Sequence, residues 1–88
     1  MHIVGKFNIR TIVDEIVAVP TGNDLLHFSG ILSLNPVGHF LFELLSEEQT
    51  EESLVEALMA EYEVDAETAR ADVREFLDVL RDHKLLAE

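Results

Sequence analysis

Short apolar segments follow one another along the first third of the chain. Residues 7–13, 15–20 and 26–34 are rich in Ile, Val, Phe and Leu, and the third segment alternates clearly between apolar and polar residues. This pattern is typical of β-strands, whose successive side chains point to opposite faces. Turn-forming residues 21–24 and the short connection at Asp14 predict an antiparallel sheet in sequential order. The segment 26–34 is then an edge strand.

From residue 35 onward the apolar period becomes helical. Asn35 is a good N-cap, and Pro36 suits the first position of a helix. Thr50 and Asp65 are N-cap candidates for a second helix, which ends near Tyr62, and for a third helix. The apolar stripe predicted for the third helix comprises Ala69, Val73, Phe76, Leu77 and Leu80. Three strands followed by three helices predict a single α+β domain over residues 1–88.

Length and composition narrow the class of protein. The chain has 88 residues, of which 48% are hydrophobic, so one core is within reach. It contains no cysteine, which excludes disulfides and favours a cytoplasmic location. No apolar run approaches the roughly 20 residues of a membrane span, and residues 1–6 lack the features of a signal peptide. We therefore expect a protein without a membrane partner.

The charge is unevenly distributed. The net charge is −12, and residues 47–67 hold nine of the eighteen acids without a single Lys or Arg. Such a surface repels phosphate backbones, so we expect no nucleic-acid partner. Four of the six basic residues lie in the last nineteen positions. They are Arg70, Arg74, Arg81 and Lys84.

Residue patterns that carry chemistry are absent. The four histidines are scattered, and no glycine-rich loop precedes a helix. Ser29 and Ser33 have no nearby histidine and acid in a nucleophile pattern. The acid pairs 47–48 and 51–52 flank a helix start, where they suit the helix dipole. We expect no metal site, no cofactor and no catalytic residue.

Two features point to binding instead. The edge strand exposes backbone groups with which another extended chain can pair. Arg70, Arg74 and Arg81 share one side of the third helix. They either pair within the helix with acids such as Glu67 and Asp78, or border a groove for an acidic peptide. The sequence leaves both interpretations open.

The segment Leu34–Leu45, read as LNPVGHFLFELL, resembles the signature of the PqqD family. That signature has Leu-Asn, two residues, Gly, two residues, an aliphatic and an aromatic residue, Glu and two leucines. The helices after Thr50 and after Asp65 are also similar, so the resemblance covers about residues 7–86. Phe42 stands where the family usually has Trp. We expect Gly38 to allow a close contact between helix and sheet.

The resemblance implies three antiparallel strands followed by three helices, related to winged helix-turn-helix domains. It also implies a function. Family members bind the leader region of ribosomally made precursor peptides that are later modified, as in pyrroloquinoline quinone biosynthesis. They present the precursor to a modifying enzyme, such as a radical-SAM protein or a leader peptidase, and are not themselves enzymes.

The resemblance further implies where a leader peptide binds: along the third strand and against the third helix. The docking edge carried over to this chain is the backbone of Phe28, Ser29, Gly30, Ile31, Leu32 and Ser33. The groove lining carried over is Val73, Leu77 and Leu80, with Arg70, Arg74 and Arg81 at its rim. For the three apolar residues, plain core packing is the alternative.

Three other functions remain as alternatives. A winged-helix topology is compatible with nucleic-acid binding, although the acidic second helix opposes it. A small enzyme lacks any visible constellation of catalytic groups. An assembly subunit can use its open sheet edge to form a homodimer, with or without binding a peptide.

Overall fold

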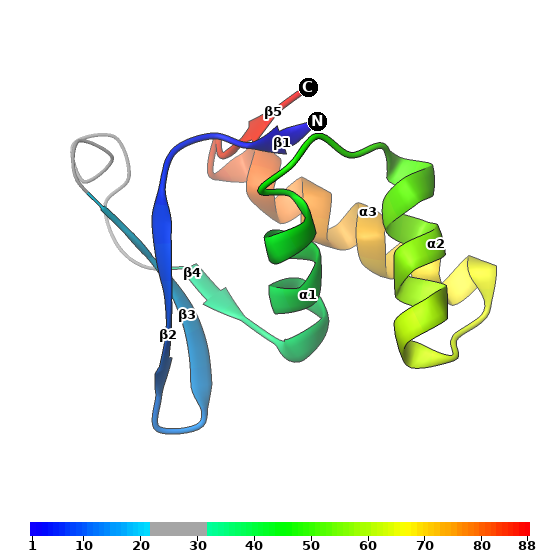
Figure 1. The fold of residues 1–88 in the computed structure, drawn as a ribbon, viewed down its shortest axis with the longest axis horizontal. Helices are drawn as coiled ribbons and strands as arrows, with labels where there is room; N and C mark the ends of the chain where they lie inside the picture. The colour runs from blue at the N-terminus through cyan, green and yellow to red at the C-terminus, as the bar shows by residue number, and fades with distance from the viewer. Residues whose placement is uncertain (22–31) are drawn as a thin grey trace.

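The computed structural model describes residues 1–21 and 32–88. Its larger sheet is antiparallel, in the order β2-β3-β4, with β2 at Phe7–Ile12, β3 at Glu15–Pro20 and β4 at Leu32–Leu34. The predicted sheet order is confirmed, and β4 forms one edge of the sheet (Figure 1). The first part of the predicted third strand, residues 26–31, lies outside the described residues.

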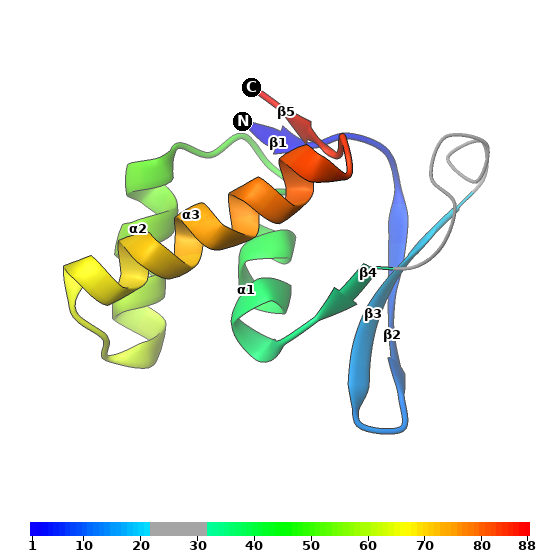
Figure 2. The same ribbon diagram turned by 180° about the vertical axis from the view of Figure 1, so that it is seen from behind.

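Three helices follow the sheet, as predicted. They are α1 (Pro36–Leu44), α2 (Glu51–Tyr62) and α3 (Ala66–Asp82). Helix α1 lies between the sheet and α2, while α3 crosses behind α1 in one view and in front of it in the opposite view (Figures 1 and 2). The α+β class is therefore confirmed.

Each helix begins at the predicted cap. The Asn35 side chain accepts a hydrogen bond from the Gly38 amide at 2.6 Å, and the Asp65 side chain accepts one from the Thr68 amide at 2.7 Å. Thr50 forms a reciprocal capping box with a residue three positions later, Ser53. These bonds satisfy amides that have no partner within the helix. Local sequence thus determines where the helices start.

The core fills the space between the sheet and the helices. From the sheet it takes Ala18, Leu32 and Leu34, all of which point to the helical side. Helix α3 contributes four buried residues at helical spacing. They are Ala69, Val73, Leu77 and Leu80. Phe42 is buried and meets the Phe7 ring edge-on, with centroids 5.6 Å apart.

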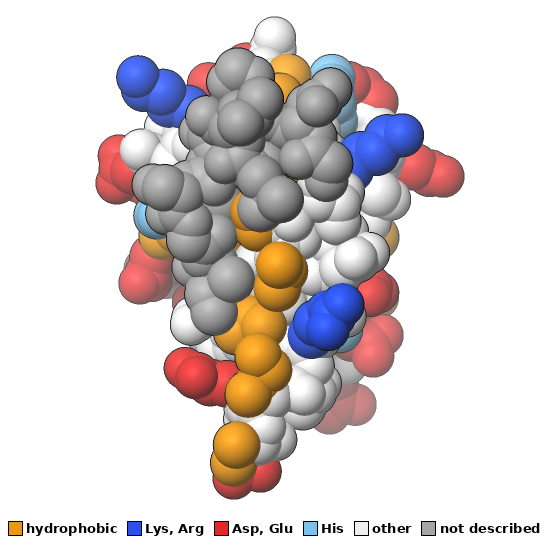
Figure 3. Space-filling view, turned by 90° about the vertical axis from the view of Figure 1, so that its left-hand side faces the viewer, with side chains coloured by type: hydrophobic (Ala, Val, Ile, Leu, Met, Phe, Trp, Pro, Cys, Tyr) orange, Lys and Arg blue, Asp and Glu red, His pale blue; other side chains and the backbone are white. Residues whose placement is uncertain are grey.

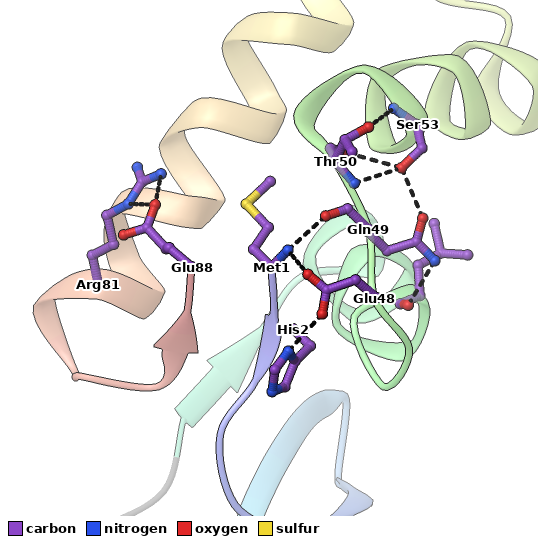
Figure 4. Close-up of polar contacts among 9 residues, drawn as sticks. Met1, His2, Glu48, Gln49, Thr50, Ser53, Arg81 and Glu88 are labelled. Atoms are coloured by element: carbon purple, nitrogen blue, oxygen red, sulfur yellow. Dashed lines mark hydrogen bonds and ion pairs between the residues drawn. The ribbon is translucent and has the colours of Figure 1, made fainter.

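The two ends of the chain pair with each other, which the sequence did not predict. Strand β1 (His2–Ile3) runs antiparallel to β5 (Leu86–Ala87). The amino terminus also forms an ion pair with Glu48 and donates a hydrogen bond to the Gln49 carbonyl at 2.8 Å (Figure 4). Strands of two residues leave no periodic pattern for a sequence to reveal.

Ion pairs link α2 to α3. Arg70 Nη1 donates to Glu51 Oε2 at 2.9 Å and lies 2.6 Å from Glu52 Oε1. Arg74 Nε donates to Glu51 Oε1 at 3.0 Å. Hydrogen bonding to Arg74 is the main cause that lowers the pKa of the Glu51 carboxyl below its usual value.

In the described part of the chain, no helix is both long and apolar enough to cross a bilayer.

The turn between β2 and β3 contains an unfavourable residue. Its two-residue loop begins with Val13, which has φ 58° and is 89% exposed. Hairpins with a positive φ at this position favour glycine, because a β-branched side chain clashes with the backbone there. Replacing Val13 with glycine is therefore expected to raise the free energy of unfolding by about 1 kcal/mol, measured by urea denaturation.

Thr11→Gly is the matched control for this change. Thr11 is exposed within β2, where glycine is expected to lower the free energy of unfolding by roughly 0.5–1 kcal/mol. Equal destabilisation by both substitutions would contradict the positive φ of Val13.

The Glu51 ion pairs predict a dependence of stability on pH. A carboxyl whose pKa is lowered by folding stabilises the protein above its unfolded pKa, here 4.5, and loses that effect as the pH falls through the lowered folded value. Glu51→Gln is expected to reduce stability slightly at neutral pH, and the difference from the parent should shrink under acid. Denaturation measured across this range tests it, with Glu56→Gln, exposed on the same helix, as the control.

Candidate functional site

A groove of about 230 Å³ lies where β4, the start of α1 and one flank of α3 meet. Its apolar lining comes from Leu34, Val37, Phe76 and Val79. Its other lining residues are Ser33, Asn35, Gly38, Asp72 and Glu75. The groove therefore adjoins the edge strand of the sheet and has an apolar surface beside an acidic one. In Figure 2, α3 crosses in front of α1, and β4 leads into the start of α1.

The rotation of α3 places four of its residues in the groove. They are Asp72, Glu75, Phe76 and Val79. Successive residues of a helix are separated by about 100° around its axis, so these side chains form a flank beside the buried stripe. Phe76 and Val79 are half-buried, which leaves part of each side chain accessible from the groove.

Gly38 allows α1 to approach α3 closely. A side chain built at this position would put its first carbon 3.2 Å from Cε1 of Phe76 and 3.1 Å from Oδ1 of Asn35. The expectation of a close contact is confirmed, but its partner is wrong: the contact is with α3 rather than with the sheet. The reason is that α1 turns Gly38 toward the Phe76 ring. The ring and the first turn of α1 together form one wall of the groove.

The predicted docking edge is described only in part. Ser33 is exposed on β4 and lines the groove. Leu32 is buried, with its side chain in the core, so only its backbone is available at the edge. Phe28, Ser29, Gly30 and Ile31 lie outside the described residues.

The apolar residues predicted to line a groove belong to the core. Val73 and Leu80 are fully buried and Leu77 is 2% exposed. None of the three is among the residues that line the groove. The structure therefore agrees with the alternative in which these three residues pack in the core. Contact between these side chains and a peptide stays a prediction.

The three arginines predicted at the rim are not among the residues that line this groove, and their contact with a peptide stays a prediction. Arg70 and Arg74 face α2 and bind its first turn, so the alternative in which they pair with Glu67 is wrong. Arg81 pairs with Asp78 at 3.1 Å, as in the alternative of pairing within the helix. It also pairs with Glu88 at 2.8 Å, the contact that Figure 4 shows. Because α2 packs against α3, the acids in the first turn of α2 lie closer to the guanidinium groups of Arg70 and Arg74 than Glu67 does.

Sequence reasoning missed most of the α3 lining. The sequence pattern places Phe76 in the core stripe, and it does not single out Asp72, Glu75 or Val79. Periodicity identifies the buried face of a helix. It does not identify which flank of that face meets the sheet, because that depends on how the helices pack together.

A larger hollow of about 710 Å³ lies on another side of α1, against β2. Phe7, Ile9 and Phe42 form part of its lining. Its described lining residues differ from those of the groove beside β4, and none of them belongs to α3. Figure 3 shows the outer side of the β2–β3 hairpin, where hydrophobic side chains follow the hairpin toward its tip.

The chemistry available in the groove is that of binding. Among residues 1–21 and 32–88, no three His, Cys, Asp or Glu side chains converge as metal ligands. The groove offers instead a sheet edge, an apolar surface and two carboxylates. An edge strand beside an apolar groove suits an extended peptide, whose backbone pairs with the strand while alternate side chains enter the groove.

The chain is similar to known proteins in both sequence and structure. The structure resembles that of TbiB1 in complex with the TbiA(beta) leader peptide, with a TM-score of 0.72, 31% sequence identity and complete coverage of both chains. No curated protein sequence matches this chain significantly. The sequence profile of the family described as Coenzyme PQQ synthesis protein D (PqqD) matches residues 15–86. That match spans strands β3 and β4 and the three helices, and the chain therefore belongs to the PqqD family.

Proposed function

We propose that this protein binds the leader region of a ribosomally made precursor peptide and presents it to a modifying enzyme. The leader adds as a strand to the edge of β4 and packs its side chains against α3. The protein itself is a binding protein and not an enzyme, as are the other PqqD-like recognition elements.

One observation carries this proposal. The chain matches TbiB1, a protein whose structure was solved with a leader peptide, over its whole length and at 31% identity. The groove beside β4 gives that likeness a physical basis in this chain. An edge strand provides backbone hydrogen bonds, which contribute affinity, and the adjoining groove selects side chains, which contributes specificity.

The groove has the parts that such a complex needs. Strand β4 ends the sheet order β2-β3-β4 among the described residues, and its Ser33 lines the groove. Phe76 and Val79 are half-buried, so each offers apolar surface that a peptide side chain can cover. Covering apolar surface contributes about 25 cal/mol per Å², and the rigid strand and helix restrict the cost of ordering the site.

The chemistry of modification then belongs to a partner enzyme, for which a radical-SAM protein or a leader peptidase is the expected class. Presentation places the leader on this protein and leaves the rest of the precursor free to enter the enzyme. The same edge of β4 can pair with a second copy of the chain, so leader and homodimer would compete. Sedimentation of the free protein with and without peptide distinguishes the two.

Phe76→Ala is expected to weaken binding of the precursor peptide encoded beside the gene by roughly 4- to 10-fold. The Phe76 ring is half-buried in the free protein, so a peptide covers only the remaining apolar surface, and its removal forfeits about half of the 1.5–3 kcal/mol of a fully buried ring. Isothermal titration calorimetry measures the change. Val79→Ala, a smaller truncation in the same groove, should weaken binding to a lesser degree.

The control for this prediction is Phe40→Ala. Phe40 is also half-buried, but its ring packs edge-on against Tyr62 of α2, with centroids 5.7 Å apart. It should cost comparable stability while leaving the affinity for peptide unchanged. Equal losses of affinity in Phe76→Ala and Phe40→Ala would place the binding site outside the groove.

Strand addition predicts an alternating pattern along the peptide. Every second amide of an added strand points toward its neighbour. Methylating single backbone nitrogens of the precursor peptide should therefore weaken binding several-fold at alternate positions and have little effect between them. Affinities of a series of singly methylated peptides test this, and a uniform response along the series would rule out pairing with β4.

A further inference from the structure

Two carboxylates at one end of the groove have no partner within the described residues. Asp72 is half-buried and Glu75 is exposed, and both line the groove. Neither takes part in an ion pair with residues 1–21 or 32–88. Among the described residues, no Lys or Arg lines the groove. The two acids are three positions apart on α3, a spacing at which like charges repel each other.

The basic residues of α3 do not neutralise this end of the groove. Arg70 and Arg74 are bound to the first turn of α2, and Arg81 is bound to Asp78 and Glu88. These pairs lie on the flank of α3 away from the groove lining. The charge facing a bound peptide is therefore negative.

The acids and the apolar residues form two matching rows along α3. Asp72 precedes Phe76 by four positions, and Glu75 precedes Val79 by four positions. Four residues of helix span about 6 Å. Residues two apart in an extended strand lie on the same face and are separated by about 6.6 Å. One face of an added strand can thus contact an apolar residue and an acid of α3 at once.

We propose that the groove selects peptide segments in which Lys or Arg stands two positions from an apolar residue. The apolar side chain packs on Phe76 or Val79, and the basic side chain reaches Asp72 or Glu75. This inference rests on the proposed peptide-binding function. The expected peptide is therefore basic, whereas the positions of Arg70, Arg74 and Arg81 in the sequence suggested an acidic peptide.

Two physical effects favour such a peptide. A cation placed between Asp72 and Glu75 relieves their mutual repulsion, so the site gains more than a neutral groove would. The net charge of −12 also attracts a basic segment from a distance and accelerates its association. Both effects weaken as the ionic strength rises, because salt screens exposed charges.

Display of random 15-residue peptides, selected on the full chain, provides the test without knowledge of the precursor. Selected sequences should be enriched in Lys or Arg two positions from an apolar residue. The peptide with the highest affinity is then synthesised with its basic residue as Lys or Arg and, separately, as Gln. Its affinity is measured for the parent protein and for Asp72→Asn/Glu75→Gln.

Removing the charge from the peptide or from the groove is expected to weaken binding roughly three- to tenfold. Removing both should add little to either change alone, because each breaks the same interaction. The control is Glu56→Gln/Glu61→Gln, which removes the same charge from exposed positions on α2. It should leave the affinity close to that of the parent, which separates a local contact from general attraction.

The outcomes distinguish the inference from the function beneath it. Selected peptides that lose affinity in Phe76→Ala but show no basic preference overturn the inference and leave the proposed function intact. Equal effects of the groove and control double variants also overturn it, because the attraction is then general. If no selected peptide depends on Phe76, the groove is not the binding site and both proposals fail.

Discussion

Helix α3 buries one stripe of its surface against α1, α2 and the sheet, and this packing sets the rotation of the helix about its axis. Ala69, Val73 and Leu80 are fully buried, so the helix has little freedom to turn. Once that stripe is fixed, one flank faces α2 and the other faces the groove. The buried leucines and valine thus act on a peptide indirectly, by determining which side chains of α3 it meets.

That rotation also separates the charges of α3 by role. The arginines that face α2 are held in ion pairs, which link two helices and leave little charge for a partner. The acids that face the groove lack such partners among the described residues. A net charge gives no hint of this division. The relevant quantity for binding is the charge that remains after the internal pairs are counted.

Much of the fold could be predicted from local sequence. Asn35, Thr50 and Asp65 each cap a helix as their residue types suggested, and the strand order followed from short connections. The terminal strands could not be predicted, because they pair over nearly the whole length of the chain. The candidate site was predicted at the level of β4 and α3, but the residues of α3 in the groove were not. They depend on how helices far apart in sequence pack together.

The pairing of β1 with β5 has a consequence for how the domain can be used. Both ends of the described chain leave the fold side by side (Figure 1). Domains with adjacent termini can be inserted into a loop of another protein, or circularly permuted, with little disturbance of their core. Inserted into an enzyme, this domain would hold a captured peptide at the millimolar effective concentration of a short tether. Peptide capture and peptide modification would then become steps within one molecule.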